Sequence, residues 1–308
     1  MKAIQVNNLV KHYGKVKALD DVSFSIDKGS VCGILGPNGS GKTTTIKSIC
    51  NLIIPDSGDI QVLGSSNRKN HKHISALFEG TRNLYWRLTP IENLRYFAGI
   101  RGYGGKEIDR KINELLDRFN LSSKKNTPVN KLSRGMQQRV ALAMTLICDT
   151  EIILLDEPTL GLDVQSFMDI KDLLTGISKD LNKTILLSTH DMQLVQDICD
   201  QVVILSNGKV VTQSKVSDLL DDFKKFTYEI KLSGKLSEKA KQYIESSSQF
   251  YLNSEGTVLE TDIKDYKDIY KIMDSLKQND IIVKEVRQKE MNIERIYMEL
   301  TTQGGALS

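Results

Sequence analysis

The sequence predicts an α/β protein with a mixed sheet, a helical subdomain and a small α+β C-terminal domain. Two short apolar runs, 31–35 and 152–155, suit strands that are buried on both faces of a parallel or mixed sheet. A glycine-rich stretch follows the first run, and residues 91–120 carry the apolar period of an amphipathic helix. Strands that alternate with helices along the chain are typical of an α/β core.

The first part of the chain begins with two segments of alternating hydrophobicity. Residues 4–6 and 22–26 alternate between apolar and polar side chains, which predicts half-buried antiparallel strands. After the buried strand at 31–35, residues 43–52 predict a helix that the turn at 55–58 closes.

The next part continues the alternation of helices and strands. In the region 91–120 one helical stripe carries Ile108, Ile112, Leu115, Leu116 and Phe119. Asn207-Gly208 suits a tight turn and predicts a hairpin between 201–205 and 209–211. The remaining expected elements are a helix after Ser133, a helix at 164–181 and a strand at 184–188.

The composition changes near residue 220, which predicts two domains, 1–220 and 221–308, with the helical subdomain at about 85–150 of the first. The charged stretch 221–225 is interpreted as a linker. Beyond it the sequence predicts strand 226–232, helix 236–247, strands 249–253 and 257–262, helix 265–278, strand 281–287 and a last amphipathic helix at about 290–300. The order βαββαβ resembles that of a ferredoxin-like split unit.

Charge, cysteines and hydropathy exclude several classes. The net charge is +3 and both signs are well mixed, so the clustered basic face of a nucleic-acid-binding protein is missing from the sequence. The four cysteines have no metal or redox spacing, which favours reduced thiols in a cytoplasmic protein. No apolar run approaches the roughly 20 residues that cross a bilayer. A role in transport would therefore need separate membrane subunits.

A phosphate-binding loop follows the strand at 31–35. The stretch fits G-x-x-x-x-G-K-[ST] and predicts a P-loop NTPase that binds ATP with Mg²⁺. Glycines let backbone N–H groups close around phosphate oxygens, and the following helix presents its N-terminus to the same anion. The alternative is a glycine-rich turn without a ligand. The loop and the helix start consist of Gly36, Pro37, Asn38, Gly39, Ser40, Gly41, Lys42, Thr43 and Thr44.

Two carboxylates end the buried strand at 152–155. Asp156 is expected to ligate Mg²⁺ together with the Thr43 hydroxyl, and Glu157 is expected to act as the general base on water. The alternative is a strand that merely ends in acidic residues before a proline. His190 follows another strand, where its imidazole can contact the γ-phosphate or the catalytic water, although a lone histidine is usually structural.

Further motifs resemble those of ABC ATPases over about residues 4–212. The stretch 132–139, Leu-Ser-Arg-Gly-Met-Gln-Gln-Arg, is similar to the LSGGQ-type signature, and Asp163 lies in a segment that resembles the D-loop. Tyr13 matches the aromatic residue that stacks on adenine, and His190 matches the switch histidine. The resemblance implies a homodimer in which Ser133, Gly135 and Gln137 of one copy bind the ATP of the other, with Asp163 at their interface.

Two positions depart from the family pattern. Arg134 stands where the signature usually has glycine, although Ser133 and Gly135 remain free to bind phosphate. Glu79 stands near the position of the family's Q-loop glutamine, and a carboxylate can ligate a hard cation such as Mg²⁺. The alternative for Glu79 is an ordinary acidic residue in a surface loop.

The resemblance implies an ATP-hydrolysing subunit of an ABC transporter at the inner face of the cell membrane, in the export branch that includes multidrug resistance. Integral membrane subunits are the implied partners. Tyr85, Trp86 and Leu88 either anchor that interface or fill a local core. The competing hypotheses are an ABC domain that only senses nucleotide and a non-transport ABC ATPase that acts on ribosomes or DNA.

Overall fold

The computed structural model describes residues 1–80, 84–222, 226–233, 236–247, 250–253, 255–263, 267–289 and 292–304, in two compact units. The first unit contains Met1–Val216 and the end of the chain from Leu300, and the second contains Ser217–Glu299. Helix α8, Val216–Asp222, spans the boundary predicted at residue 220. Part of the stretch interpreted as a linker is therefore helical.

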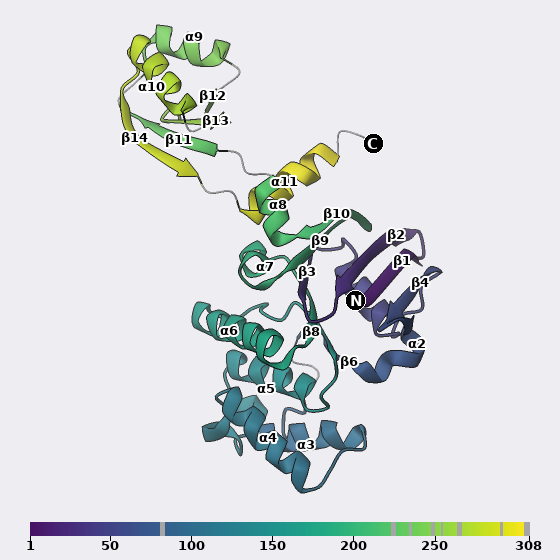
Figure 1. Ribbon diagram of the computed structural model, residues 1–308. Coiled ribbons are helices and arrows are strands. Elements are labelled where there is room, and N and C mark those ends of the chain that lie inside the picture. Colours follow the sequence, from purple (N-terminus) through teal and green to yellow (C-terminus); the bar gives the residue numbers. More distant parts are fainter. Residues whose placement is uncertain are drawn as a thin grey trace. The chain divides into compact units, whose positions relative to one another are not determined.

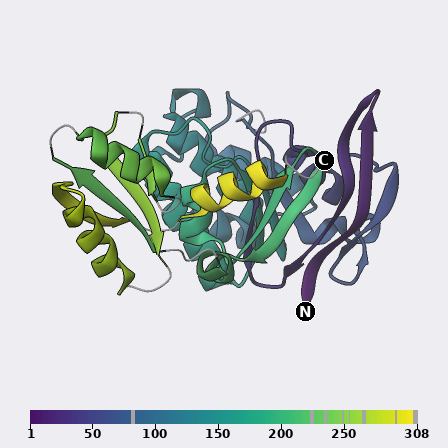
Figure 2. The same ribbon diagram turned by 90° about the horizontal axis from the view of Figure 1, so that it is seen from above.

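The smaller sheet of the first unit is antiparallel and has the strand order β2-β1-β4-β5. Figure 2 shows its long β1–β2 pair in purple. The alternation predicted around residues 4–6 and 22–26 is confirmed, since apolar side chains there are buried at every second position. The strands are β1 Lys2–Tyr13, β2 Val16–Asp27, β4 Ser57–Val62 and β5 Ser65–Ser66.

The larger sheet of the first unit is mixed and has the order β10-β9-β3-β8-β7-β6. All neighbouring strands are parallel except the β9–β10 hairpin, which turns through Asn207 and Gly208, both with positive φ. This confirms the predicted mixed sheet of an α/β core. The strands are β3 Val31–Leu35, β6 Ile74–Leu77, β7 Ile152–Asp156, β8 Thr184–Thr189, β9 Gln201–Ser206 and β10 Lys209–Lys215.

Helix α1, Lys42–Ile49, is held in a core that both sheets share. Ile46 and Ile49 are fully buried against side chains such as Phe24 of the small sheet and Leu154 of the large one. Burying a side chain of this size contributes roughly 1.5–3 kcal/mol. The start of α1, directly after the glycine-rich loop, is therefore fixed at the carboxyl end of β3, the strand that Figure 1 labels beside its parallel neighbour β9.

The helical subdomain is built from α3, Pro90–Ile100, α4, Lys106–Arg118, and α5, Arg134–Leu146. The single helical period read over 91–120 is divided here, because Gly102 and Gly105 adopt positive φ between the first two helices. The predicted apolar stripe of α4 is buried. The other helices of this unit are α2 Asn67–Asn70, α6 Val164–Leu181 and α7 Met192–Ile198.

The second unit has an antiparallel sheet with the order β12-β13-β11-β14. Helices α9 and α10 pack with this sheet in one hydrophobic core. The core contains Ala240 and Ile244 of α9, Ile272 and Leu276 of α10, and Ile230 of the sheet. The elements are β11 Phe226–Leu232, α9 Glu238–Ser246, β12 Phe250–Leu252, β13 Val258–Ile263, α10 Asp268–Gln278 and β14 Val283–Lys289. The last helix, α11 Ile293–Gly304, begins in this unit, and its residues from Leu300 belong to the first unit. Among the described helices of both units, none combines the length and the apolarity that a bilayer span requires.

Candidate nucleotide site

Glycines shape the loop between β3 and α1. Gly41 has φ 104°, and a Cβ at this position would lie 2.7 Å from the Ala18 carbonyl oxygen. Gly39 also has a positive φ of 81°. Gly41 is the N-cap of α1, and no described side chain caps this helix end. The first N–H groups of α1 are therefore free to bind an anion, to which the helix dipole adds an attraction.

Lys42 lies at the base of this loop. Its side chain is only 7% exposed, and its ammonium donates hydrogen bonds to the Gly36 carbonyl oxygen at 2.8 Å and the Pro37 carbonyl oxygen at 3.3 Å. The Ser40 hydroxyl is also buried and has no hydrogen-bond partner among the described residues. The Lys42 ammonium is a buried cation, and the Ser40 hydroxyl is a buried donor without a partner among the described residues. Both groups suit a site that binds phosphate oxygens.

Asp156 lies beside Thr43, the second residue of α1. Both Asp156 carboxylate oxygens accept from the Thr43 hydroxyl at 3.0 Å. The Ser188 hydroxyl donates to Asp156 Oδ1 at 2.6 Å from the parallel strand β8, where Ser188 is the register partner of Asp156. The Thr43 hydroxyl and the Asp156 carboxylate thus lie together near the carboxyl ends of β7 and β8, and both are oxygen ligands that Mg²⁺ accepts.

Glu157 is held from several sides. It has a φ of 50°, rare for a residue other than glycine, and its N–H donates to the Ser188 carbonyl oxygen and hydroxyl, each at 3.1 Å. Its carboxylate, 9% exposed, lies 3.6 Å from the Lys42 ammonium and 3.0 Å from His190 Nδ1. The carboxylate is thus held next to the loop, as general-base chemistry requires.

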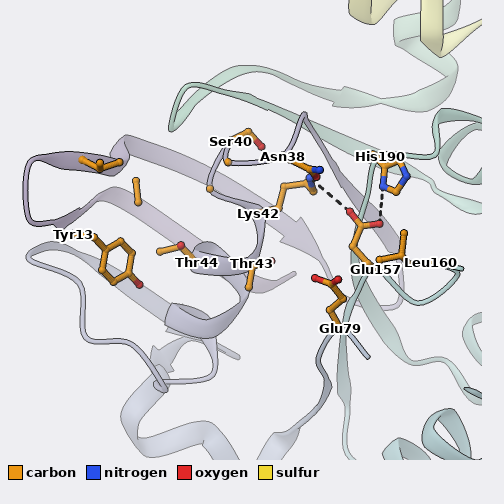
Figure 3. A pocket seen from close by; sticks show the side chains of 14 residues that line it. Tyr13, Asn38, Ser40, Lys42, Thr43, Thr44, Glu79, Glu157, Leu160 and His190 are labelled. Atoms are coloured by element: carbon orange, nitrogen blue, oxygen red, sulfur yellow. Dashed lines mark hydrogen bonds and ion pairs between the residues drawn. The ribbon is translucent and has the colours of Figure 1, made fainter. Parts of the chain in front are cut away.

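Ser40, Lys42, Thr43, Glu157 and His190 line a cavity of about 600 Å³ (Figure 3), whereas Gly36, Pro37, Asp156 and Ser188 do not contribute to its lining. In Figure 3, Glu79 and Glu157 lie on one side of it and Tyr13 lies toward the other end, with Lys42 and Thr43 between them. The cavity lining brings together the predicted residues Tyr13, Asn38, Gly39, Ser40, Gly41, Lys42, Thr43, Thr44, Glu79, Glu157 and His190.

The predicted signature residues do not line this cavity. Ser133 is the N-cap of α5, and its hydroxyl accepts from Met136 N at 3.3 Å. Gly135 lies against Ser166 of α6, whose Cβ would be 2.7 Å from a Cβ added to the glycine. Gln137 is buried and its amide donates to the Val129 and Leu132 carbonyl oxygens. Gly135 thus permits close helix packing, and Gln137 braces the turn before α5.

Asp163 also lies outside the cavity and caps α6. Its carboxylate accepts from the Ser166 N–H at 2.9 Å and the Ser166 hydroxyl at 3.0 Å. These hydrogen bonds, the backbone one first, lower the pKa of the Asp163 carboxyl below its usual range. The carboxylate therefore caps the helix of its own chain and stays ionised at neutral pH.

Four side chains at the site were not predicted from the sequence. Ser188 holds both acidic residues, while Val16, Ala18 and Leu160 contribute apolar surface to the cavity. A signal for Ser188 exists, since it stands two positions before His190 in a strand whose carboxyl end meets that of β7. Val16, Ala18 and Leu160 carry none, because small and apolar residues are common in any strand or loop.

No group of three or more histidine, cysteine, aspartate and glutamate side chains gathers around a metal position in the part of the chain that is described. A Mg²⁺ ion in this site would instead use Thr43 and Asp156 together with phosphate oxygens. This donor set fits Mg²⁺, which is commonly bound through one or two carboxylates and completes its shell from water and phosphate, so that Glu79 on the same cavity is a further candidate ligand.

Residues 19–160 match the family model described as ABC transporter. The ABC transporter ATP-binding protein NatA of Bacillus subtilis is 41% identical over 210 residues, covering 67% of this chain and 85% of NatA. The methionine import ATP-binding protein MetN of Staphylococcus haemolyticus is 33% identical over 231 residues, covering 71% of this chain and 67% of MetN. The predicted export branch is not supported by these relatives, because one of them is named for import.

The fold is also similar to that of a solved ATP-binding cassette. The dimeric ATP-binding cassette MJ0796, in a post-hydrolysis state with ADP and Pi, superposes with a TM-score of 0.62 at 29% identity, covering 69% of this chain and 98% of that one. The predicted ABC-type cassette fold is confirmed. The chain belongs to the ATP-binding subunits of ABC transporters, and it binds ATP with Mg²⁺ and hydrolyses ATP.

Proposed function

We propose that two copies of this chain close around two ATP molecules and so drive transport through separate membrane subunits. The observation that carries this proposal is the position of the signature. Ser133 and Gly135 match the family motif, yet neither lines the cavity of its own chain. Free N–H groups at the start of α5 can bind an anion, and the ATP of a second copy supplies one.

Within one copy, the roles follow from the contacts. Gly36 and Pro37 present the carbonyl groups that hold Lys42, whose ammonium then turns to the phosphates. Thr43, Asp156 and Glu79 are the residues that would hold Mg²⁺. The ion neutralises phosphate charge when it is bound. Glu79 supports this role because its side chain reaches the same cavity as Thr43 (Figure 3).

Glu157 accepts the proton of the attacking water in this proposal. His190 Nδ1 fixes one carboxylate oxygen at 3.0 Å, and the other is 3.6 Å from Lys42. Once phosphate attracts the Lys42 ammonium, the carboxylate loses a competing cation and becomes a better acceptor. The exposed ring of His190 is then free at its second nitrogen to reach the γ-phosphate.

Two predicted nucleotide contacts take different roles. We propose that Gln137 positions the signature segment, since its amide N–H groups donate hydrogen bonds to the carbonyl oxygens of residues 129 and 132 in the turn before α5. Asp163 meets the second copy as a helix cap, with its carboxylate already bonded to Ser166. In this proposal Gln137 shapes the interface through the turn before α5, and Asp163 shapes it through the start of α6.

Ser188→Ala is expected to lower kcat about 10- to 100-fold, because it removes the hydroxyl that orients both Asp156 and Glu157. Affinity for Mg-ATP should change less, since Lys42 and the loop remain. Phosphate release and equilibrium nucleotide binding measure the two effects. Ser178→Ala, a buried serine of α6, is the matched control. A variant at Ser188 with unchanged kcat would contradict the positioning role.

An apolar groove is the proposed contact with a membrane subunit. A cavity of about 560 Å³ is lined by side chains of β6, α3 and α5 and by Leu84 and Tyr85. Tyr85 is 47% exposed and Trp86 45%, while Leu88 is partly buried, so the exposure of the two aromatic side chains favours an interface over a local core. Tyr85 is steadied by the Tyr96 hydroxyl at 2.9 Å. An apolar segment of a membrane protein suits this lining.

Tyr85→Ala is expected to reduce co-purification with the membrane subunit at least about tenfold, the loss typical of an interface anchor, while the ATPase rate of the isolated chain stays unchanged. Tyr103→Ala is the matched control, because Tyr103 is equally exposed at 48% but does not line the groove. The measurement is a quantitative pull-down from detergent-solubilised membranes. Recovery of ribosomes instead of a membrane protein would contradict the transport role.

We also propose export as the direction and the inner face of the cell membrane as the location. The proposal rests on resemblance to the branch in which one ATPase domain and one membrane subunit are separate chains. The identity of the membrane subunit in the same pull-down tests the direction. An importer subunit together with an external solute-binding protein would overturn it.

A further inference from the structure

Strand β1 leaves its partner β4 before it reaches the nucleotide cavity. The β1–β4 pairing ends at Val10, opposite Ser57, and its register shifts between Asn7 and Val10. The pairing of β1 with β2 is also irregular, with shifts on both sides of Lys11. The last residues of β1, which carry Tyr13, therefore need another support on the β4 side.

Asp56, in the turn before β4, supplies this support. Its N–H donates to the Val10 carbonyl oxygen at 2.8 Å, where the ladder ends. Its Oδ2 then accepts from the His12 N–H at 2.6 Å and lies 3.0 Å from His12 Nδ1, while Oδ1 accepts from the Lys11 ammonium at 2.9 Å. Beyond Val10 the Asp56 carboxylate therefore accepts the backbone hydrogen bond of β1 that a neighbouring strand would otherwise accept.

The hydrogen bonds also keep the carboxylate charged. The Lys11 ammonium and then the His12 N–H lower the pKa of Asp56 to about 2. Lys11 has a further fixed contact, since its ammonium donates to the Ile54 carbonyl oxygen at 2.8 Å. The same ammonium lies 5.8 Å from the centroid of the Tyr13 ring, a cation–π distance. The ring that faces the cavity therefore packs beside a lysine that Asp56 holds.

The ring lies at the apolar end of the cavity. Tyr13 is 48% exposed and Val16 is 67% exposed, and both line the cavity with Ala18. Tyr13 and Val16 are register partners on β1 and β2. An exposed aromatic ring beside two small apolar side chains offers a flat surface on which a base can stack.

We infer that Asp56 is a positioning residue for the nucleobase, which holds Lys11 and the end of β1 so that Tyr13 presents its ring to adenine. The inference rests on the stacking of Tyr13 on adenine, which the family resemblance implies and which we propose for this chain. Asp56 does not line the cavity, so its removal should weaken binding of the base and leave binding of the triphosphate, by Lys42 and the loop, unchanged.

The test compares two ligands on the full chain by equilibrium titration, Mg-ATP and Mg-tripolyphosphate, which lacks a base. Asp56→Ala should weaken Mg-ATP binding about five- to tenfold, which is part of the free energy of stacking one base, and should leave the affinity for tripolyphosphate unchanged. Asp59→Ala, which removes a carboxylate bonded to Gln61 in the same strand, should change neither affinity. Asp56→Asn, which keeps an acceptor but loses the charge, should give a smaller loss.

Three results would overturn the inference. Unchanged ATP affinity in Asp56→Ala, while Tyr13→Ala loses affinity, would remove Asp56 from base recognition. Equal losses for ATP and tripolyphosphate would assign Asp56 a general structural role. Unchanged ATP affinity in Tyr13→Ala as well would show that the ring is not a base platform, and the proposed role of Tyr13 would fail with it.

Discussion

Glu157→Gln is expected to lower ATP turnover by about 10³-fold while Mg-ATP still binds. A general base typically contributes about 10²- to 10⁴-fold, and an amide cannot accept the proton of the attacking water. The replacement keeps the shape of the side chain, and the backbone of residue 157 remains tied to Ser188. Phosphate release under saturating nucleotide gives the turnover, and titration with Mg-ATP gives the affinity.

The control for this prediction is a glutamate at the other end of β7. Glu151 precedes β7 and pairs with Lys28 on the surface, so Glu151→Gln removes one carboxylate without touching the cavity. Its turnover should equal that of the unmodified chain. Full activity in Glu157→Gln would mean that another group removes the proton, and the assignment of the base would be wrong.

Lys42→Ala is expected to weaken Mg-ATP binding itself, by about 100-fold. The buried ammonium offers charge-assisted hydrogen bonds to phosphate, each worth roughly 1.5–3 kcal/mol, and alanine offers none. The change also leaves Glu157 without the cation 3.6 Å away, so a buried carboxylate then faces the phosphates unopposed. Both effects act in the same direction. Equilibrium titration with Mg-ATP measures the loss.

Lys47→Ala is the control for this lysine. Lys47 lies in the last turn of the same helix, and its ammonium contacts the Phe78 ring instead of the cavity. Its removal should leave the affinity within about twofold, as for most surface substitutions. Unchanged affinity in Lys42→Ala would place the triphosphate somewhere other than the loop.

The fold was predictable where apolar period and turn chemistry agree. Residues 164–181 predicted a helix, and α6 has the same bounds, with Asp163 as N-cap and Asn182 in the left-handed conformation at its end. The buried runs at 31–35 and 152–155 became β3 and β7. The break between α3 and α4 was missed, because Gly102 and Gly105 interrupt a period that continues on both sides.

The sequence predicted those site residues that belong to short local motifs. The phosphate loop and Asp156-Glu157 are short stretches whose residue types are demanded by phosphate and water. Ser188 and Asp56 act through partners 32 and 44 residues away, so strand pairing alone brings them into place. Gly135 stays a proposed phosphate contact, but the motif did not reveal that the approach of Ser166 on another helix also requires a glycine there. Such contacts depend on tertiary packing, which motif spacing does not encode.

Light scattering of the Glu157→Gln chain, with and without Mg-ATP, tests most directly whether two copies bind the nucleotide together. Without nucleotide the particle should have the mass of one chain, 34.6 kDa. With Mg-ATP it should have twice that mass, and Ser133→Arg in the same background should abolish the increase. A nucleotide-saturated sample that keeps the mass of a single chain would contradict the proposed closure of two copies around ATP.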